Sequence, residues 1–306
     1  MYGNRTLALL ALAALAGFYS PINAAAAEVA AKVATDSATG VVSLTRKGAW
    51  HLAESSNFQV CSLRGAKEAQ DVAVGCERLR NEVATLCGLQ PGHWSPRCQI
   101  VLHVDAKSYV ATVGHAGAAT AASALTQRSG ARINRRKIDV RGDVSDYLTS
   151  ALPHELCHVL LADRFADVPL WCDEGLALLL DPLDKQQLHE RDLRSGDQRG
   201  ELMPINELFG LQRYPAAERW GLFYGQSASI VRCLLQRGTP QQLLAFAKAQ
   251  RSLGTNKALR EVYGLSGVAE LDRHWRSRLA SPSDAPLTLV TFAASPTPFS
   301  AVAEAP

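Results

Sequence analysis

The sequence lacks the patterns that mark several large classes of protein. Its 306 residues contain no CxxC pair, no long run of lysine and arginine, no dinucleotide-type glycine fingerprint and no internal repeat. The cysteine spacing therefore argues against a cysteine zinc site, and the basic segment from Arg132 to Arg136 is more typical of a solvated loop or strand edge than of a nucleic-acid surface. The net charge of +3 singles out no partner. We therefore expect no nucleic-acid partner.

The amino-terminal segment is apolar but short. Thr6 to Phe18 form an apolar block after a single positive charge, and the small-residue run Ala24 to Ala27 follows. This is the pattern of a signal peptide, and the block is shorter than the roughly 20 residues of a membrane span. The first cysteine, Cys61, lies far downstream, which argues against a lipoprotein anchor. We expect a signal peptide over residues 1–27, cleaved near Ala25 to Ala27, and an exported chain, periplasmic or extracellular, without a stable membrane span; an uncleaved anchor is the alternative.

The strongest motif is His154-Glu155-Leu156-Cys157-His158, an HExxH sequence. On a helix, residues i and i+4 lie about 40° apart around the axis, so both imidazoles can face one ion. Glu155 is rotated by about 100° from His154 and reaches a water instead of the metal. Catalytic zinc takes three protein ligands and keeps one position for water, so one more ligand is needed.

Glu174 is the candidate third ligand. It stands in Trp171-Cys172-Asp173-Glu174-Gly175-Leu176-Ala177, near the start of a helix expected over Asp173 to Leu180. A turn around Asp167-Val168-Pro169 would pack this helix antiparallel to the first, with Glu174 opposite the two histidines. Gly175 would let the helices approach closely. The competing interpretation is two helical histidines that pack near a buried glutamate.

HExxH followed by W-x-x-E-G-x-A resembles the gluzincin metallopeptidases, and more narrowly the bacterial peptidase MA-like domain proteins. Phe223 to Val231 is similar to a helix in that group that begins with a tyrosine lining the catalytic cleft. By this resemblance Tyr224, and less directly Gln226, enter the functional argument, with the Tyr224 hydroxyl donating to the oxyanion. The resemblance covers about residues 145 to 240.

The chain departs from that family pattern at two points. Fifteen residues separate His158 from Glu174, fewer than in thermolysin-like peptidases, so a compact turn must join the two helices. Cys157 stands where many relatives carry threonine or another small residue. It faces away from the metal if the histidines face toward it, and we do not count it as a ligand.

Together these residues predict an exported zinc-dependent metallopeptidase with one Zn²⁺ per chain. His154, His158 and Glu174 would hold the ion, which lowers the pKa of water, and Glu155 would take the proton and pass it to the leaving amine. The substrate is a peptide or protein, with an endopeptidase slightly preferred because no acidic motif for a free amine is evident. The alternatives are a non-catalytic zinc-containing peptide- or cell-wall-binding module and a zinc hydrolase of a non-peptide amide.

Other polar and aromatic side chains near the motif have less certain roles. Asp173 could orient a ligating histidine, but an acid in the first helical turn, stabilised by the helix dipole, is the favoured interpretation. Trp171 is expected to pack beneath the glutamate helix. His103, His115 and His189 are expected to lie at the surface without a metal role.

The predicted fold is α+β: a small amino-terminal sheet with an edge strand before the HExxH helix, followed by a mainly helical part, as in gluzincins. By the resemblance, the strand Lys137 to Arg141 is an edge that pairs with extended substrate, although an ordinary sheet strand fits equally. Asp143 or Ser145 would cap the catalytic helix, and Pro153 requires a start near Ala151 or a kink.

The expected elements and boundaries follow from these patterns. In the sheet part we expect strands at Phe58 to Cys61 and Gln99 to Val104, around a helix from about Lys67 to Cys87 ended by Gly88. The later helices are expected over Asp184 to Leu193, Arg219 to Gln236, Pro240 to Ala249 and Val268 to Leu279. The expected organisation is an N-terminal extension over 28–50, a peptidase domain over 51–280 with its sheet part at 51–143 and helical part at 144–280, and a disordered tail over 281–306.

Seven cysteines in an exported chain predict disulfides. From the order of strand, helix and strand, the first choice among three pairings is Cys61 with Cys76 and Cys87 with Cys98. Cys157, Cys172 and Cys233 could include one bridge between helices of the active site.

Overall fold

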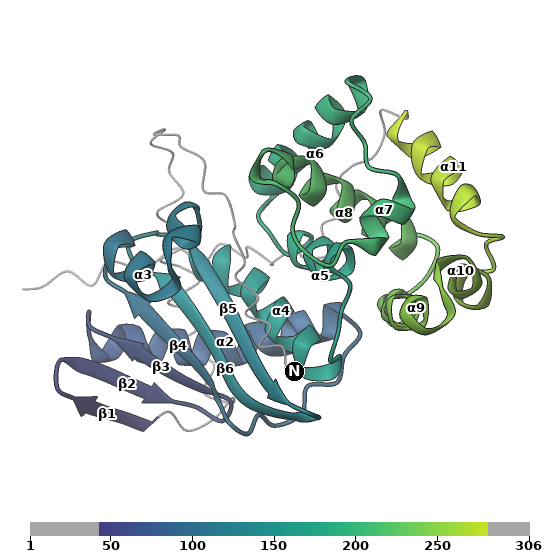
Figure 1. The fold of residues 1–306 in the computed structure, drawn as a ribbon. Helices are drawn as coiled ribbons and strands as arrows, with labels where there is room; N and C mark the ends of the chain where they lie inside the picture. The colour runs from purple at the N-terminus through teal and green to yellow at the C-terminus, as the bar shows by residue number, and fades with distance from the viewer. Residues whose placement is uncertain (1–42, 281–306) are drawn as a thin grey trace, which may run out of the picture. The chain divides into compact units, whose positions relative to one another are not determined.

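Residues 43–280 are described by a computed structural model (Figure 1). The expected signal peptide, the expected tail and residues 28–42 of the expected extension lie outside this part of the chain. The described residues divide into two compact units, one formed by 43–79 and 93–152 and the other by 80–92 and 153–280. The first unit holds the strands and the second is helical, which confirms the α+β class.

The first unit is built on a six-stranded mixed sheet in the order β1-β2-β3-β4-β6-β5. Neighbouring strands are antiparallel except for β3 with β4 and β4 with β6, which are parallel. The strands are β1 (Ser43–Lys47), β2 (Trp50–Glu54), β3 (Phe58–Ser62), β4 (Cys98–His103), β5 (Ala122–Ser129) and β6 (Arg132–Arg141). The sheet thus begins inside the segment expected to be an extension, and the expected boundary at residue 51 falls within β2.

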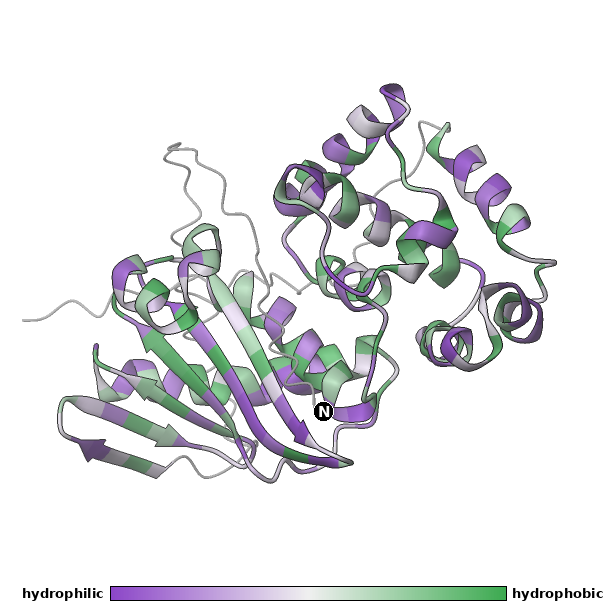
Figure 2. Cartoon of the chain, viewed as in Figure 1, coloured by the Kyte–Doolittle hydropathy of each residue, from purple (hydrophilic) through white to green (hydrophobic). Residues whose placement is uncertain are grey.

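The centre of the sheet carries the core of this unit. Phe58, Val60, Ile100, Ile138 and Val140 alternate along β3, β4 and β6 and have no exposed surface. Alternation with period two places these side chains on one face of each strand. Neighbouring strands also differ in composition. Figure 2 shows that β4 is mainly hydrophobic and β6 mainly hydrophilic.

The edge of the sheet differs from the prediction. The expected edge strand Lys137 to Arg141 lies within β6, which pairs with β4 on one side and with β5 on the other. Its backbone groups are therefore already used. Of the two interpretations of this segment, the edge that pairs with substrate was wrong, and the ordinary sheet strand is the one found. The edge strand on this side of the sheet is β5, because the chain turns at Gly130, with a φ of 60°, and folds back as a hairpin; β1 is the edge strand on the other side.

Three α-helices follow strands of the sheet along the chain: the first comes after β3, the second after β4 and the third after β6. α2 (Ala66–Leu86) ends where Gly88 adopts a φ of 65°, as predicted. α3 (Ala106–Val113) is capped by the Asp105 side chain, and the short 3₁₀ helix η1 (His115–Ala119) follows. α4 (Ala151–Arg164) carries the HExxH motif.

The start of α4 decides between two predictions. The helix begins at Ala151, so Pro153 lies in the first turn, where its missing N–H costs no helical hydrogen bond. The prediction that Asp143 or Ser145 caps this helix was wrong. A turn-rich segment separates both residues from α4, and the Asp143 carboxylate accepts hydrogen bonds from Arg141 instead.

The remaining helices form most of the second unit. All four later helices that the sequence predicts are present, two of them extended by several residues. The helices are α5 (Leu170–Leu178), α6 (Leu183–Gln198), α7 (Ile205–Gly210), α8 (Trp220–Leu235), α9 (Pro240–Leu253), α10 (Thr255–Tyr263) and α11 (Val268–Leu279), with the 3₁₀ helix η2 (Ala217–Arg219) before α8. Within residues 43–280, no helix has the length and hydropathy needed to cross a membrane.

α8 is the central helix of the second unit and packs against α5, α6 and α9. A Cβ atom added to Gly175 would lie 2.5 Å from Val231 Cγ2 and 2.8 Å from the Ser227 carbonyl oxygen. Gly175 therefore allows a close helix approach as predicted, but the partner helix is α8.

All seven cysteines lie within the described residues, and all seven are buried and form no disulfide bond. Neither expected pair, Cys61 with Cys76 or Cys87 with Cys98, is bonded. The Cys61 sulfur faces the Gln99 side chain on the neighbouring strand β4, at 4.0 Å. The Cys87 sulfur faces Cys157.

Candidate metal centre

The second unit brings the two histidines of the HExxH motif together on α4. His154 and His158 are 4% and 2% exposed, and their ring centroids lie 4.9 Å apart. Residues four apart on a helix lie on the same face, one turn apart, which explains this pairing. A short segment after Arg164 then connects α4 to α5, which begins at Leu170.

Glu174 comes from α5 and completes the group. Its Oε2 atom lies 3.9 Å from His154 Nε2, and the residue has no exposed surface. One ligand atom from each of His154, His158 and Glu174 lies within 4.8 Å of the others. The three residues predicted as metal ligands are therefore adjacent, and the compact turn expected between the helices is present.

Each histidine is oriented by a carboxylate on its other ring nitrogen. His158 Nδ1 donates to Asp173 Oδ1 at 2.8 Å, and His154 Nδ1 donates to Asp181 Oδ1 at 3.1 Å. This leaves both Nε2 atoms for the space that faces Glu174. Asp173 therefore orients a histidine, whereas the interpretation favoured from the sequence was an acid in the first helical turn, stabilised by the helix dipole. It occupies the first turn of α5 as well, so both features hold.

Asp181 did not emerge from the sequence. It follows α5 at a position two turns beyond Glu174, a spacing of seven residues that would place it on the same helical face. That spacing is the only signal that pointed to it.

Two buried polar atoms at the centre of this group have no hydrogen-bond partner. They are His158 Nε2 and Glu174 Oε2. Unpaired polar atoms are costly in a protein interior, so their presence requires an explanation. A bound cation would satisfy both, and two imidazole nitrogens with one carboxylate match the ligands that catalytic zinc takes. The residues present therefore fit a zinc ion.

The pKa values reflect the crowding of charges in this buried group. Burial raises the pKa of Glu174 to about 7, although the neighbouring His158 and His154 act in the opposite direction. Burial lowers the pKa of His158, but the charges of Asp173 and Glu174 outweigh that effect and raise it to about 10. A cation in place of the His158 proton would relieve the same accumulation of negative charge.

A tyrosine that the sequence did not single out contacts Glu174, the candidate third ligand. The Tyr214 hydroxyl donates a hydrogen bond to Glu174 Oε1. Tyr214 lies in the irregular segment between α7 and η2, and its ring packs edge-on against Phe223 at 5.9 Å. Burial raises the pKa of Tyr214 well above its usual value, with a further contribution from Glu174, so the hydroxyl keeps its proton. This segment has no helical or strand periodicity, so no pattern in the sequence pointed to Tyr214.

Tyr224, predicted from the resemblance, lies in the first half of α8 and is 3% exposed. Burial raises its pKa, and the charges of Glu174 and Glu155 raise it further, which places the phenol in the same electrostatic environment as the metal group. Its ring packs edge-on against His189 at 5.4 Å. His189 is therefore largely buried beside Tyr224, and the prediction of a surface position was wrong.

Glu155 is buried at the same place. It is 1% exposed, and its charge acts on His154, His158 and Tyr224. Cys157 has its sulfur against Cys87, in keeping with the prediction that it is not a ligand.

Two other residues of the predicted segments are structural. Trp171 stacks on Phe209 with ring centroids 4.3 Å apart, as expected for a packing residue. Gln226 accepts a hydrogen bond from the Met203 backbone N–H and donates one to the Met203 carbonyl. Its buried amide thus anchors the chain before α7, and no functional role is needed to explain it.

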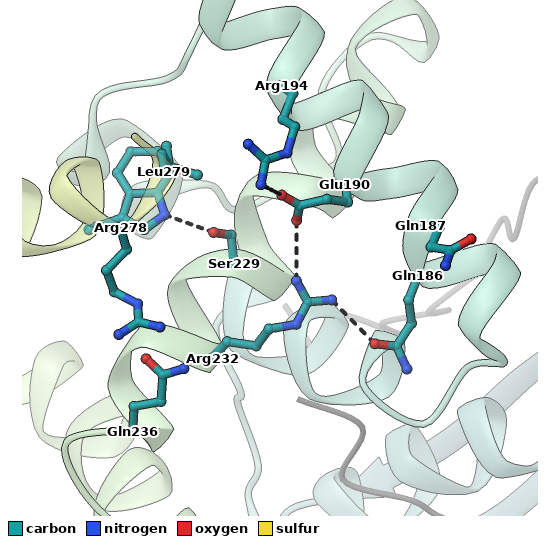
Figure 3. Close-up of a pocket in the computed structure, with 10 residues that line it drawn as sticks. Gln186, Gln187, Glu190, Arg194, Ser229, Arg232, Gln236, Arg278 and Leu279 are labelled. Carbon is teal, nitrogen blue, oxygen red and sulfur yellow. Dashed lines mark hydrogen bonds and ion pairs between the residues drawn. The ribbon is translucent and has the colours of Figure 1, made fainter. Parts of the chain in front are cut away.

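A separate pocket of about 80 Å³ lies among α6, α8 and α11 (Figure 3). Arg232 Nη2 donates to Gln186 Oε1 at 3.3 Å, as Figure 3 shows. Gln186 Nε2 in turn donates to the Asp181 carbonyl at 2.8 Å. Since Asp181 orients His154, Gln186 holds the backbone of an orienting residue from the pocket side. The residues that line this pocket are Gln186, Gln187, Glu190, Arg194, Ser229, Arg232, Gln236, Trp275, Arg278 and Leu279.

Comparison with known proteins found no match: no family model, no curated protein and no solved structure is similar to this chain.

Proposed function

We propose that the chain is a zinc-dependent metallopeptidase in which His154, His158 and Glu174 hold one Zn²⁺. The observation that carries this proposal is the pair of unpartnered buried atoms, His158 Nε2 and Glu174 Oε2, beside a second imidazole whose Nδ1 is already engaged by Asp181. Two orienting carboxylates on ligating histidines are typical of metal sites and add to the support.

The residues around the ligands support hydrolysis. Bound zinc would supply a Lewis acid that polarises a carbonyl group and lowers the pKa of water. Glu155 is the one carboxylate of the motif that is not a proposed ligand, and we assign it as the base that takes a proton from the attacking water. It then returns the proton to the leaving amine. The Tyr224 hydroxyl, kept protonated by its raised pKa, donates to the oxygen that gains negative charge.

The proposed substrate is a peptide or protein outside the cytoplasm. Export rests on the signal-peptide pattern over residues 1–27, and endopeptidase activity on the lack of an acidic motif for a free amine. A purely structural zinc site has no use for a buried base such as Glu155. This favours a hydrolase over a non-catalytic binding module.

Metal analysis combined with two kinds of variant tests the proposal. Wild type should contain close to one zinc per chain, and Glu174→Ala and His158→Ala should lose it. Glu155→Gln should keep zinc and fold but lose cleavage of a peptide library, while Glu218→Gln, at an exposed position before α8, should keep both.

The possible failures of this experiment have different meanings. A folded wild type that takes up no zinc would reject the metal centre. Zinc without peptide cleavage, in wild type and Glu155→Gln alike, would point to the binding module. Unchanged hydrolysis in Glu155→Gln would overturn the assignment of the base.

A further inference from the structure

Two cysteines of the second unit face each other directly behind the ligand helix. The sulfur atoms of Cys87 and Cys157 lie 3.9 Å apart, and the residues are 2% and 0% exposed. Cys157 is the residue before His158 on α4, and Cys87 is the residue after the last one of α2. The pair therefore joins the helix that carries two proposed metal ligands to a segment 70 residues earlier in the chain.

A second contact joins α4 to the same segment after α2. The Arg164 guanidinium donates a hydrogen bond to the Gln90 carbonyl oxygen. Arg164 follows Cys157 by seven residues, about two helical turns, so both side chains leave the same face of α4. This face of α4 thus contacts the segment 87–90 at two points, Cys87 and Gln90.

We propose that Cys87 and Cys157 form a disulfide bond in the oxidised protein. The S–S bond length is about 2.05 Å, so the two sulfurs must approach by roughly 1.9 Å, a shift on the scale of side-chain rotation. This pairing replaces the one expected from the sequence, in which Cys87 bonded to Cys98.

The oxidant is a small-molecule or protein disulfide, reduced to two thiols in the reaction. One cysteine thiolate attacks the external disulfide, which breaks the external S–S bond, forms a mixed disulfide and releases the first thiol. The second cysteine thiolate then attacks the protein sulfur of the mixed disulfide, forms the Cys87–Cys157 bond and releases the second thiol. The protons of the two cysteines end on the two released thiols. Because both cysteines are buried in the folded chain, the oxidant reaches them while the chain folds.

Cys172 is the competing partner. It is buried on α5, and it is near enough to Cys87 and Cys157 for ionisation in this group of thiols to raise the pKa of Cys157 and of Cys172. Three pairings are therefore available within this cluster. The direct sulfur contact selects Cys87 with Cys157 and leaves Cys172 as a thiol.

Peptide mapping after oxidative refolding tests the pairing. The reduced, denatured full-length chain is refolded with a mixture of reduced and oxidised glutathione, free thiols are alkylated, and tryptic peptides are identified by mass spectrometry without reduction. We expect one peptide pair joined through Cys87 and Cys157, two hydrogen masses lighter than the sum of its reduced parts. We also expect the oxidised protein to melt at a higher temperature than the same protein after reduction.

Three variants distinguish this bond from other effects. Cys87→Ala and Cys157→Ala should abolish the joined peptide and the difference in melting temperature between oxidised and reduced protein. Cys233→Ala, at another buried cysteine on α8, should keep both. Alkylation of both Cys87 and Cys157 in refolded wild type would overturn the proposal, and so would a dominant peptide in which Cys87 is joined to Cys172 or Cys98. Because mapping of the wild type decides between these outcomes, a variant that fails to fold does not prevent the test.

Discussion

The hydroxyl of Tyr214 donates a hydrogen bond to Oε1 of Glu174, while Oε2 of the same carboxylate is buried with no hydrogen-bond partner. One oxygen is thus held by the protein and the other is left to face His154, whose Nε2 lies 3.9 Å away. A carboxylate fixed in this way loses less rotational freedom when it binds a cation. Tyr214 is therefore a positioning residue for the third proposed ligand.

Tyr214→Phe should weaken zinc binding by about 10- to 100-fold, because outer-shell hydrogen bonds to ligands typically contribute that much. A competition titration against a chelator of known affinity measures the change. Tyr263→Phe is the matched control, since the Tyr263 hydroxyl is buried and makes no hydrogen bond. Equal zinc affinity in Tyr214→Phe and wild type would reject the positioning role.

Asp173→Asn and Asp181→Asn should each reduce zinc affinity by about 10- to 100-fold, with the fold retained. The charged acceptor that fixes the Nδ1–H tautomer is lost, and an amide holds the imidazole less strongly. Asp184→Asn, at an exposed position of α6, should bind zinc as wild type does. If both core variants match that control, the two carboxylates have only a packing role.

Gly175→Ala should destabilise the second unit by about 1–3 kcal/mol, because the new methyl group overpacks the α5–α8 contact. The clash involves the Ser227 backbone as well as Val231, so rotation of one side chain cannot relieve it. Chemical denaturation measures the change in the free energy of unfolding. Gly210→Ala provides the control, since no atom lies within 4 Å of its added Cβ, and a similar loss in both variants would argue against the packing explanation.

The metal-free protein should lose stability as the pH rises. The pKa of His158 is raised from 6.5 to about 10, and that of Glu174 from 4.5 to about 7. Each group binds its proton more tightly in the folded state. Its contribution is therefore fully present below the unfolded pKa and is lost as pH rises through the folded value. Melting temperatures of chelated protein from pH 5 to pH 10 should fall, and Glu174→Gln should remove the part of the fall below about pH 7.

Zinc affinity should change with pH in the opposite direction, since the metal must displace protons from the same groups. Binding should tighten as the pH rises and release protons, which calorimetry in buffers of different ionisation enthalpy can count. Zinc content and peptide cleavage should fall together as the pH drops through about 7, the raised pKa of Glu174, because below it both Glu174 and His158 bind protons in the metal-free protein. Cleavage that persists after complete chelation would contradict a metal-dependent reaction.

Tyr224→Phe should lower kcat by about 100- to 1,000-fold if its hydroxyl is the oxyanion donor, with zinc content unchanged. Zinc analysis and steady-state kinetics on one preparation separate this effect from loss of the metal. His189→Gln, which alters the ring packed against Tyr224, should have the smaller effect, because it leaves the hydroxyl in place. A Tyr224→Phe variant with normal kcat would limit the residue to packing.

Much of the candidate site was predictable because its parts lie within single helices. The spacing of His154 and His158 places both side chains on one face of α4. The apolar periodicity of α8 and α11 predicted the ends of both helices to within one residue. The α+β class followed from the same local patterns. In the first unit, β3, α2 and β4 were predicted to within one residue of where they occur. Each is a single element whose pattern can be read from a continuous stretch of sequence.

Contacts between distant segments were not predictable in this way. The position of β6 inside the sheet depends on its antiparallel pairing with β5. No strand was predicted at β5, because its sequence has no clear strand pattern. Tyr214, Asp181 and the Cys87–Cys157 contact involve residues outside regular elements or far apart in the chain. Helical and strand periodicity sets the direction of side chains within one element, whereas only packing decides which elements meet. The sequence by itself therefore determined the proposed ligand residues and the helices that carry them. The tertiary structure decided which residues orient those side chains, which strand lies at the sheet edge beyond β6 and which cysteines meet.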